Sequence, residues 1–391
     1  MVDSFARFDT RLGPCALAWN ERGITAVLLP DKSPAALVRR VRERREGAVE
    51  RAPDARATAA IDAMRALIDH GAGDLSGIAL DLRGVPPFHQ RVYDAARAIA
   101  PGETLTYGAL AEKLERKGAS RAVGQAMQKN PFPIVVPCHR VLAADRKLGG
   151  FSAEGGVVTK LRMLVRERDA MLARKSPVEL GYDPKAAIEH LKSSDRKLRS
   201  LIERVGPFAL RLDPTPTVFA AVAQAIAYQQ LTGRAAETIF TRVCALFPFD
   251  VEGPSPALVA RTSDDKLRAA GLSTAKTAAI KDLAKKCVEG SVPSLSVLSK
   301  LSDDEVIERL TAVRGVGRWT VEMLLVFRLG RGDVLPVDDY GVKKGFARTF
   351  GGELPSKAVM IERATRWAPY RSVASWYLWR ANELDDAAPA V

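Results

Sequence analysis

The chain has 391 residues, more than a single hydrophobic core usually serves, so two or three domains are expected. Hydrophobic residues make up 47% and charged residues 27%, a globular composition that excludes a largely disordered or fibrous protein. The formal net charge of +13 favours a polyanionic partner, nucleic acid first, although a soluble enzyme that is simply basic is the alternative on charge alone.

The cysteines lie far apart and include no CxxC pair, which indicates a reducing compartment: Cys15, Cys138, Cys244 and Cys287. The N-terminus carries Asp3 and Asp9 and lacks the basic and apolar regions of a signal peptide. No run of about 18 apolar residues occurs in the sequence. We therefore expect a cytoplasmic monomer that is not bound to a membrane.

Residues 1–85 predict an α+β scaffold, with short strands within 15–30 and 77–84 and helices over 34–45 and 57–70. Residues 86–171 predict a second domain with helices over 87–99, 106–116, 120–130 and 159–169 and a strand over 133–137. The two middle helices are short and are joined by polar residues including Gly118, which is the pattern of a helix-turn-helix.

Residues 172–184 are aperiodic and contain two prolines, so we expect a linker there, followed by an all-α domain over 185–391. Two segments, 262–287 and 301–327, repeat one plan of acidic turn, helix, glycine-bearing hairpin and second helix. In the second repeat Ser302 and Glu305 have the spacing of a capping box. The second half is thus predicted to consist of helical hairpins.

The stretch "IVVPCHRV", residues 134–141, places a cysteine beside a histidine and an arginine. A cysteine reacts as its thiolate, which the neighbouring His139 and Arg140 favour by lowering the pKa of Cys138. Adjacent side chains on an extended strand point to opposite faces, so a water or a local bend has to join Cys138 to His139. Taken alone, the pair is more often a buried structural cysteine with an incidental histidine.

The surroundings favour chemistry. The helix-turn-helix, Asn-Pro, "PCHRV", "GGFSAEGG" and a helix ending at Glu167 together resemble the O6-alkylguanine-DNA alkyltransferases over about residues 5–170. The resemblance implies a winged-helix-like catalytic domain in which Cys138 accepts the alkyl group, His139 activates Cys138 through a water, and Glu167 orients His139. It implies that the protein is consumed by its reaction.

The same resemblance implies substrate and DNA contacts around the cysteine. Tyr107 supports departure of the guanine, Arg121 fills the gap left by the flipped base, and Asn130 is the hinge asparagine before the proline. Ser152 contacts the base edge, and we place Arg140 in the same set. In isolation, Tyr107 fits a core aromatic and Arg121 a solvated charge.

In the second half, "VRGVGRWT" places Gly315 and Gly317 in a hairpin whose backbone N–H groups can hold a phosphate. A lone GxG is more often a structural turn. The segment resembles the helix-hairpin-helix 3-methyladenine DNA glycosylases over about residues 185–382, since Asp339 follows twenty positions after Trp319. The resemblance implies that Asp339 stabilises the oxocarbenium charge of the sugar, beside the structural Asp338.

The resemblance also defines the subtype and the pocket. Trp319 stands where lyase-competent relatives carry a lysine, so a monofunctional enzyme is expected, and too few cysteines follow for an iron-sulfur cluster. Tyr228 and Trp379 are expected to line an aromatic pocket for cationic alkylated purines, and Leu231 to enter the duplex as a wedge. Met323 replaces the pocket tyrosine of the bacterial inducible relative. For Trp379, Trp367 and Trp376, core packing is the alternative.

These features predict a bifunctional repair protein that binds double-stranded DNA containing alkylated bases and needs no metal or other cofactor. The alternative is a DNA-binding sensor or regulator with only one active domain. Against it, both Cys138 and Asp339 are present, and Cys15 alone cannot supply the metal-binding cysteine cluster of the methylation-responsive regulators.

Overall fold

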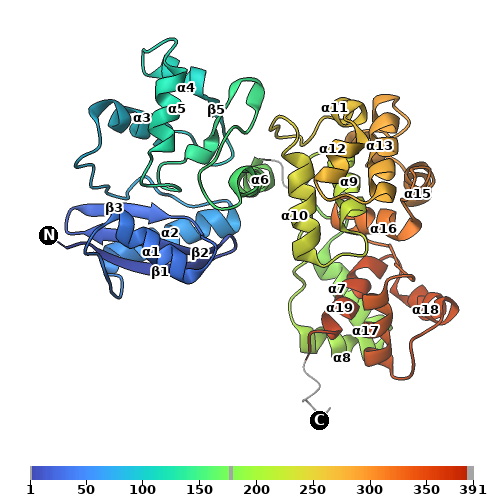
Figure 1. Cartoon of the computed structure of the whole chain (residues 1–391). Helices are drawn as coiled ribbons and strands as arrows, with labels where there is room; N and C mark the ends of the chain where they lie inside the picture. The colour runs from blue at the N-terminus through green and yellow to red at the C-terminus, as the bar shows by residue number, and fades with distance from the viewer. Residues whose placement is uncertain (1, 176–178, 385–391) are drawn as a thin grey trace. The chain divides into compact units, whose positions relative to one another are not determined.

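The computed structural model describes residues 2–175 and 179–384 (Figure 1). Contacts divide the chain into two compact units, one formed by residues 1–176 and 232–255 and the other by residues 177–231 and 256–391. Across the described residues, no helix combines the length and the apolar character needed to cross a bilayer.

The first unit begins with a four-stranded sheet in the order β3-β2-β1-β4. The strands are β1 (Ser4–Thr10), β2 (Gly13–Asn20), β3 (Gly23–Leu28) and β4 (Val49–Glu50). β1 and β3 pair antiparallel to β2, and β4 pairs parallel to β1. Helix α1 (Pro34–Arg44) packs Leu37 and Val41 on one face, and α2 (Ala55–His70) packs Met64 and Leu67 on the other. Alternate residues of the strands therefore enter two different cores.

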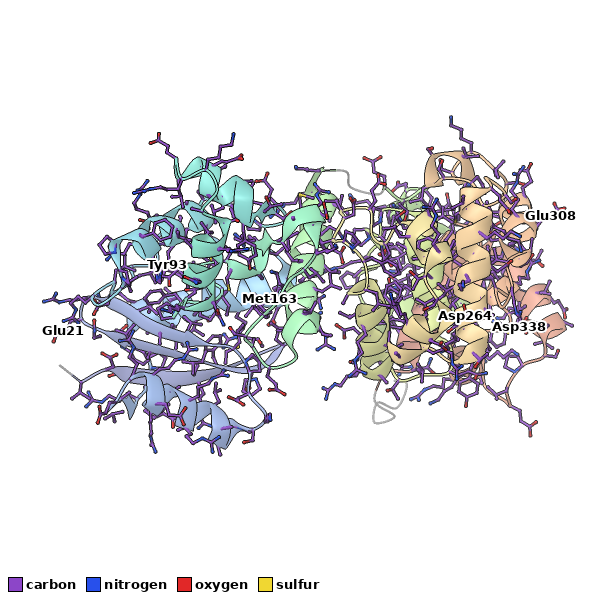
Figure 2. All side chains as sticks on the ribbon, turned by 45° about the horizontal axis from the view of Figure 1, so that its top comes forward. Glu21, Tyr93, Met163, Asp264, Glu308 and Asp338 are labelled. Atoms are coloured by element: carbon purple, nitrogen blue, oxygen red, sulfur yellow. The ribbon has the colours of Figure 1, made fainter. Side chains whose placement is uncertain are left out.

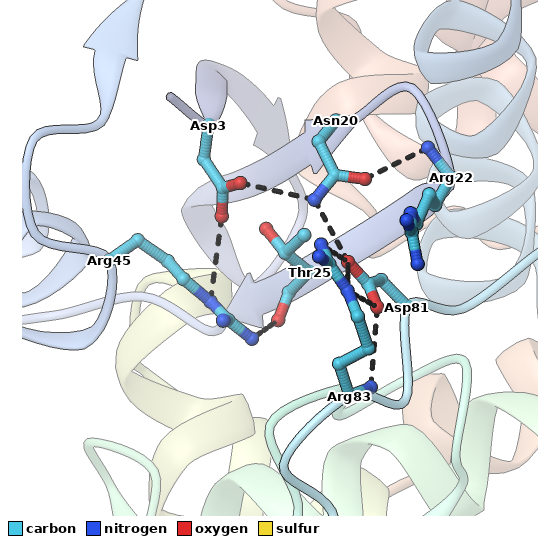
Figure 3. A network of polar contacts seen from close by, with 7 residues as sticks. All are labelled: Asp3, Asn20, Arg22, Thr25, Arg45, Asp81 and Arg83. Carbon is cyan, nitrogen blue, oxygen red and sulfur yellow. Dashed lines mark hydrogen bonds and ion pairs between the residues drawn. The ribbon is translucent and has the colours of Figure 1, made fainter. Parts of the chain in front are cut away.

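A polar network joins the end of this sheet to the segment before the next helix (Figure 3). Asn20 Nδ2 donates to Asp81 Oδ2 at 2.9 Å and to Asp3 Oδ1 at 3.2 Å. Arg83 Nε donates to Asp81 Oδ1 at 2.9 Å. The strand predicted within 77–84 is wrong: the segment makes only a single bridge, Ile24 with Leu80, through the bonds from Ile24 N to Ala79 O at 2.9 Å and from Asp81 N to Ile24 O at 2.8 Å.

Four helices form the rest of the core of the first unit: α3 (Pro87–Arg97), α4 (Tyr107–Lys113), α5 (Ser120–Gln128) and α6 (Gly156–Lys175). Two short parallel strands, β5 (Leu105–Thr106) and β6 (Val141–Leu142), accompany them. Tyr93 and Met163, labelled in Figure 2, are buried among these elements, and Tyr93 Oη donates to Ala126 O at 3.1 Å. The turn between α4 and α5 contains Gly118 with φ of +85°, a left-handed conformation that glycine adopts without strain.

The strand predicted over 133–137 is also wrong. Ile134 has φ of +78°, Val136 N donates to Phe132 O at 2.8 Å, and the segment makes a buried turn. Asn130 explains why no ladder is needed, because its Nδ2 donates to Val136 O and its Oδ1 accepts from Phe132 N. The short 3₁₀ helices η1 (Cys138–Arg140) and η2 (Ala144–Arg146) follow.

Residues 232–255, which contain α10 (Gly233–Cys244), belong by contacts to the first unit although they lie within the range predicted for the second domain. Phe249 packs with Leu161 and Leu164 of α6, and Arg162 Nη2 donates to Thr238 Oγ1 at 2.9 Å. The predicted linker, 172–184, includes residues 176–178, which lie outside the described residues. Its first part is helical, because α6 continues to Lys175.

The described residues of the second unit form helices joined by loops and contain no strand, as predicted for an all-α domain. Its helices are α7 (Pro184–Ser194), α8 (Arg196–Val205), α9 (Val218–Tyr228), α11 (Pro256–Arg261), α12 (Asp264–Ala269), α13 (Thr274–Val288), α14 (Leu295–Leu298), α15 (Asp303–Thr311), α16 (Arg318–Phe327), α17 (Tyr340–Phe350), α18 (Lys357–Ala364), the 3₁₀ helix η3 (Thr365–Trp367) and α19 (Arg371–Ala381). The capping box of Ser302 and Glu305 is confirmed at the start of α15.

Helices α17 and α19 approach one another closely in the core of this unit. A Cβ at Gly345 of α17 would lie 1.8 Å from the carbonyl oxygen of Leu378 of α19, so only glycine fits there. Trp367 and Trp376 are buried nearby, which confirms the alternative of core packing for these two residues.

Candidate functional sites

Cys138 opens the 3₁₀ helix η1 at the end of the buried turn. Because η1 is helical, Cys138 and His139 do not alternate across a strand, which corrects the geometry expected for an extended chain. Burial raises the pKa of Cys138, and Asn130 and Lys160 offset only part of this effect. The resting cysteine is therefore a thiol that needs a base, and the sequence-based expectation of a lowered pKa is wrong.

His139 and Glu167 form a buried pair. His139 Nε2 lies 2.8 Å from Glu167 Oε1, and both side chains are almost inaccessible to solvent. Burial alone would raise the pKa of Glu167, but His139 and Arg140 outweigh it and lower the pKa to about 2. Burial lowers the pKa of His139 against the opposing effect of Glu167, so the imidazole is neutral and able to accept a proton.

The other ring nitrogen, His139 Nδ1, is buried and has no hydrogen-bond partner among the described residues. A buried polar atom in this position calls for a partner such as an ordered water. The neutral tautomer that donates from Nε2 to Glu167 leaves Nδ1 as the acceptor. The arrangement fits a base that reaches the thiol through a water.

Arg140 was expected to contact substrate or DNA, and its position corrects this. Its side chain is only 4% exposed. Its Nε and Nη2 each lie 2.9 Å from the carboxylate of Glu167, and Nη1 donates to Ile99 O at 2.6 Å. Arg140 therefore fixes Glu167 rather than meeting a ligand.

Lys160 of α6 was missed by the sequence reasoning. It is fully buried, its Nζ donates to Val141 O at 2.7 Å, and burial lowers its pKa to about 8. Its positive charge lowers the pKa of Cys138. Lys160 precedes Glu167 by seven residues and therefore shares its helix face, a spacing that could have revealed it.

The other residues expected around Cys138 are distributed as follows. Tyr107 begins α4 and is half-buried; burial raises its pKa, and Cys138 adds to this effect once it is a thiolate. Asn130 is buried and shapes the turn before the cysteine. Arg121, at the second position of α5, and Ser152, in the loop before α6, are exposed.

In the second unit, Asp339 is the N-cap of α17 and accepts three N–H bonds. Its Oδ1 accepts from Val342 N and from Trp379 Nε1, each at 2.8 Å, and its Oδ2 accepts from Trp319 Nε1 at 2.8 Å. Asp338, labelled in Figure 2, is exposed and instead pairs with Lys357. The structure thus brings Asp339 together with both tryptophans that the sequence singled out.

A cavity of about 290 Å³ lies between α9 and α16; Tyr228 lines it as expected, but Trp379 and Asp339 are not among its lining residues. Tyr228, Met323 and Phe327 line it, and the ring of Phe327 lies 5.3 Å from that of Trp379. Asp213, Gln224, Thr320 and Arg328 add polar and charged groups to a wall that is otherwise aromatic and aliphatic.

The glycine hairpin and the expected wedge lie on the same unit. Gly315 has φ of +74°, and Gly317 is the N-cap of α16, so the hairpin geometry is confirmed. Leu231 is 41% exposed just after α9, and Trp319 is 42% exposed.

Comparisons with known proteins match each half of the chain separately. The family model described as "6-O-methylguanine DNA methyltransferase, DNA binding domain" matches residues 87–169. The family model described as "HhH-GPD superfamily base excision DNA repair protein" matches residues 223–369.

Individual relatives give the same division. The alkylbase DNA glycosidase-like protein mag2 of Schizosaccharomyces pombe is 34% identical over 52% of this chain and 95% of its own length. The methylated-DNA–protein-cysteine methyltransferase of Methanothermobacter thermautotrophicus is 30% identical over 39% of this chain and 77% of its own length. The bifunctional transcriptional activator/DNA repair enzyme Ada of Escherichia coli is 34% identical over 42% of this chain and 45% of its own length. The chain therefore belongs to the 6-O-methylguanine DNA methyltransferase family through its first half and to the HhH-GPD superfamily of base excision repair proteins through its second half.

Proposed function

We propose that the chain is a bifunctional protein for the repair of alkylated double-stranded DNA. In the first unit, Cys138 Sγ attacks the alkyl carbon of an O6-alkylguanine, the bond from that carbon to O6 breaks, and a thioether forms. The proton of the thiol passes through a water to His139 Nδ1, and the departing guanine takes up one proton from solvent. His139 then returns its proton to water, so that thiol and O6-alkylguanine give thioether and guanine with no net change in protons. The observation that carries this proposal is the buried Nδ1 of His139, left as an acceptor by the bond of Nε2 to Glu167.

The residues on the DNA side take the roles of a base-flipping site. The pair α4–α5 acts as the helix-turn-helix of a winged-helix-like domain, and Arg121 enters the duplex from the start of α5. Tyr107 supports the leaving guanine, and Ser152 contacts the edge of the flipped base. The exposed positions of Arg121 and Ser152 support these assignments.

The transfer step has a direct test. After incubation with a duplex containing O6-methylguanine, mass spectrometry should find one added methyl group on the peptide that contains Cys138. The Cys138→Ser variant should remain unmodified, while Cys287→Ser, at a cysteine away from the site, should react like the wild type. An unmodified wild-type peptide after full exposure would sink the proposal.

For the second unit, we propose hydrolytic release of alkylated purines such as 3-methyladenine. The glycosidic bond breaks, the cationic purine leaves as a neutral base, and water adds to the sugar carbon while Asp339 stabilises the positive charge on the sugar. The bonds from Trp319 and Trp379 support this role, since two indole N–H groups hold the carboxylate. Tyr228 and Trp379 contact the purine, and Gly315 and Gly317 bind a backbone phosphate.

Asp339→Asn should abolish release of 3-methyladenine from alkylated duplex DNA and leave transfer to Cys138 unchanged. Asp338→Asn, at the adjacent exposed carboxylate, is the matched control and should retain release. Borohydride should trap no covalent complex, since Trp319 cannot form a Schiff base. Loss of both activities in Asp339→Asn would contradict independent sites.

A further inference from the structure

The first of the two repeated hairpin segments has no role in the sites described above, yet its second helix, α13, reaches both DNA-facing loops of the second unit. The first loop is the wedge turn, residues 228–231. Leu231 N donates to Tyr228 O at 3.3 Å, and Gln230 has φ of +56°, a conformation that a non-glycine residue keeps only when neighbours hold it.

Lys276 of α13 supplies that support. Its Nζ donates to Gln229 O at 2.7 Å and to Ala227 O at 2.9 Å. These carbonyls belong to the last turn of α9 and to the wedge turn itself, where helical partners are missing. The ammonium group of Lys276 therefore joins the end of α9 to the turn that presents Leu231. Because the donor is charged, these hydrogen bonds are stronger than those from a neutral donor.

The second loop is the hairpin loop, residues 312–317, and the same helix holds it. Asp282 Oδ2 accepts from Arg314 N at 2.8 Å, and Lys286 Nζ donates to Ala312 O at 2.6 Å. The wedge turn and the hairpin loop are also linked directly, because Gln229 Nε2 donates to Gly315 O at 3.0 Å.

Resting on the glycosylase activity proposed above, we propose that Lys276 is a positioning residue for the wedge Leu231, and that α13 fixes the distance between this wedge and the loop that binds the DNA backbone. A wedge must enter the duplex at a set distance from the phosphates that the protein holds. Lys276, Asp282 and Lys286 extend from one rigid helix, so the two loops cannot shift independently.

The experiment is a double-mutant cycle between Lys276→Met and Leu231→Ala, since a shared pathway makes two effects non-additive. Unstacking is followed by the fluorescence of 2-aminopurine placed next to an abasic-site analogue in a duplex, and base release by single-turnover excision of 3-methyladenine. Each single variant should reduce the unstacking signal and slow excision about tenfold, as expected for loss of one charge-assisted contact. The double variant should match Leu231→Ala within about twofold.

Lys285→Met is the matched control, because Lys285 lies on the same helix with a side chain 70% exposed, forms its ion pair with Glu289, and donates no hydrogen bond to either loop among the described residues. It should behave like the wild type, and Lys276→Arg should recover most of the unstacking. Multiplied effects in the double variant, or wild-type unstacking by Lys276→Met, would overturn the inference. If the wild type unstacks the abasic duplex but releases no base, the proposed glycosylase activity fails while the role of Lys276 is still measured by fluorescence.

Discussion

His139 is bonded to Glu167 through Nε2 at 2.8 Å, which leaves Nδ1 as the ring nitrogen free to receive a proton. This relationship fixes both the tautomer and the direction of proton transfer. It also makes Glu167 responsible for two things at once, because the same carboxylate balances the buried charge of Arg140.

Glu167→Gln should therefore lower both activity and stability. The amide cannot orient His139 as the carboxylate does, so we expect single-turnover methyl transfer to slow about 100-fold. Arg140 would remain buried without its counter-charge, which should reduce the free energy of unfolding by about 3 kcal/mol. Quenched-flow transfer and urea unfolding measure the two effects. Glu154→Gln, at an exposed glutamate, should change neither.

The acid stability of the first unit follows from the same residue. The pKa of Glu167 is about 2 in the folded protein against an ordinary value of 4.5, so the unfolded chain binds more protons between these values. The stabilisation is complete above about pH 4.5 and is lost as the pH falls toward 2. Urea unfolding between pH 2 and 6 should show a smaller pH dependence for Glu167→Gln than for the wild type. Equal slopes would contradict the assignment.

Asp81→Asn should loosen the junction between the sheet and α3. In the wild type, the hydrogen bonds that Asp81 accepts from Arg83 and Asn20 lower the pKa of its carboxyl group. The carboxylate therefore stabilises the fold above its ordinary pKa of 3.8, and this stabilisation is lost as the pH falls. At pH 7 we expect the melting temperature to fall by about 2–4 °C for each kcal/mol lost. Asp74→Asn, at an exposed position, is the control in differential scanning calorimetry, and an equal decrease there would remove the network from the explanation.

Trp379→Phe tests whether the indole N–H or only the ring matters to Asp339. Phenylalanine keeps the aromatic wall against Phe327 but removes the bond to Oδ1, so we expect kcat for base release to fall about tenfold with a smaller change in KM. Trp376→Phe, three residues earlier on α19, should lower stability without that kinetic pattern. A change confined to KM would assign Trp379 to purine binding alone.

Much of the fold could be predicted because its helices carry strong apolar periodicity and clear caps, as the capping box of Ser302 and Glu305 shows. The segment at Ile134 could not. Its β-branched residues are buried, which suggested a strand, but whether a buried run pairs or turns depends on a distant partner, here the side chain of Asn130.

The site residues also divide into those that a local motif reveals and those that depend on distant contacts. Cys138 and Asp339 were identified by local motifs, whereas the contacts of Arg140 and the buried position of Lys160 depend on how α6 packs against η1. Charge patterns on single segments assign such residues to the surface by default. The support of the wedge turn by Lys276 was equally hidden, because its acceptors are backbone carbonyls that no sequence pattern marks.

Gly345→Ala should disturb the glycosylase site from a distance. The added methyl group would meet Leu378 O at 1.8 Å and force α17 away from α19, which carry Asp339 and Trp379 respectively. We expect a loss of about 3 kcal/mol in the free energy of unfolding and slower base release. Gly233→Ala, where a Cβ has open space, is the control in both assays.

The close packing of α17 against α19 at Gly345 shows that a substitution outside the pocket can affect the site. Gly345 lies six residues along the chain from Asp339, yet its lack of a side chain lets α17 and α19 come close enough for Trp379 Nε1 to donate to Asp339 Oδ1. A survey of inactive variants confined to the pocket wall would pass over it. Gly345 carries no reactive group, and its contribution to the site is the space that its missing side chain leaves to α19.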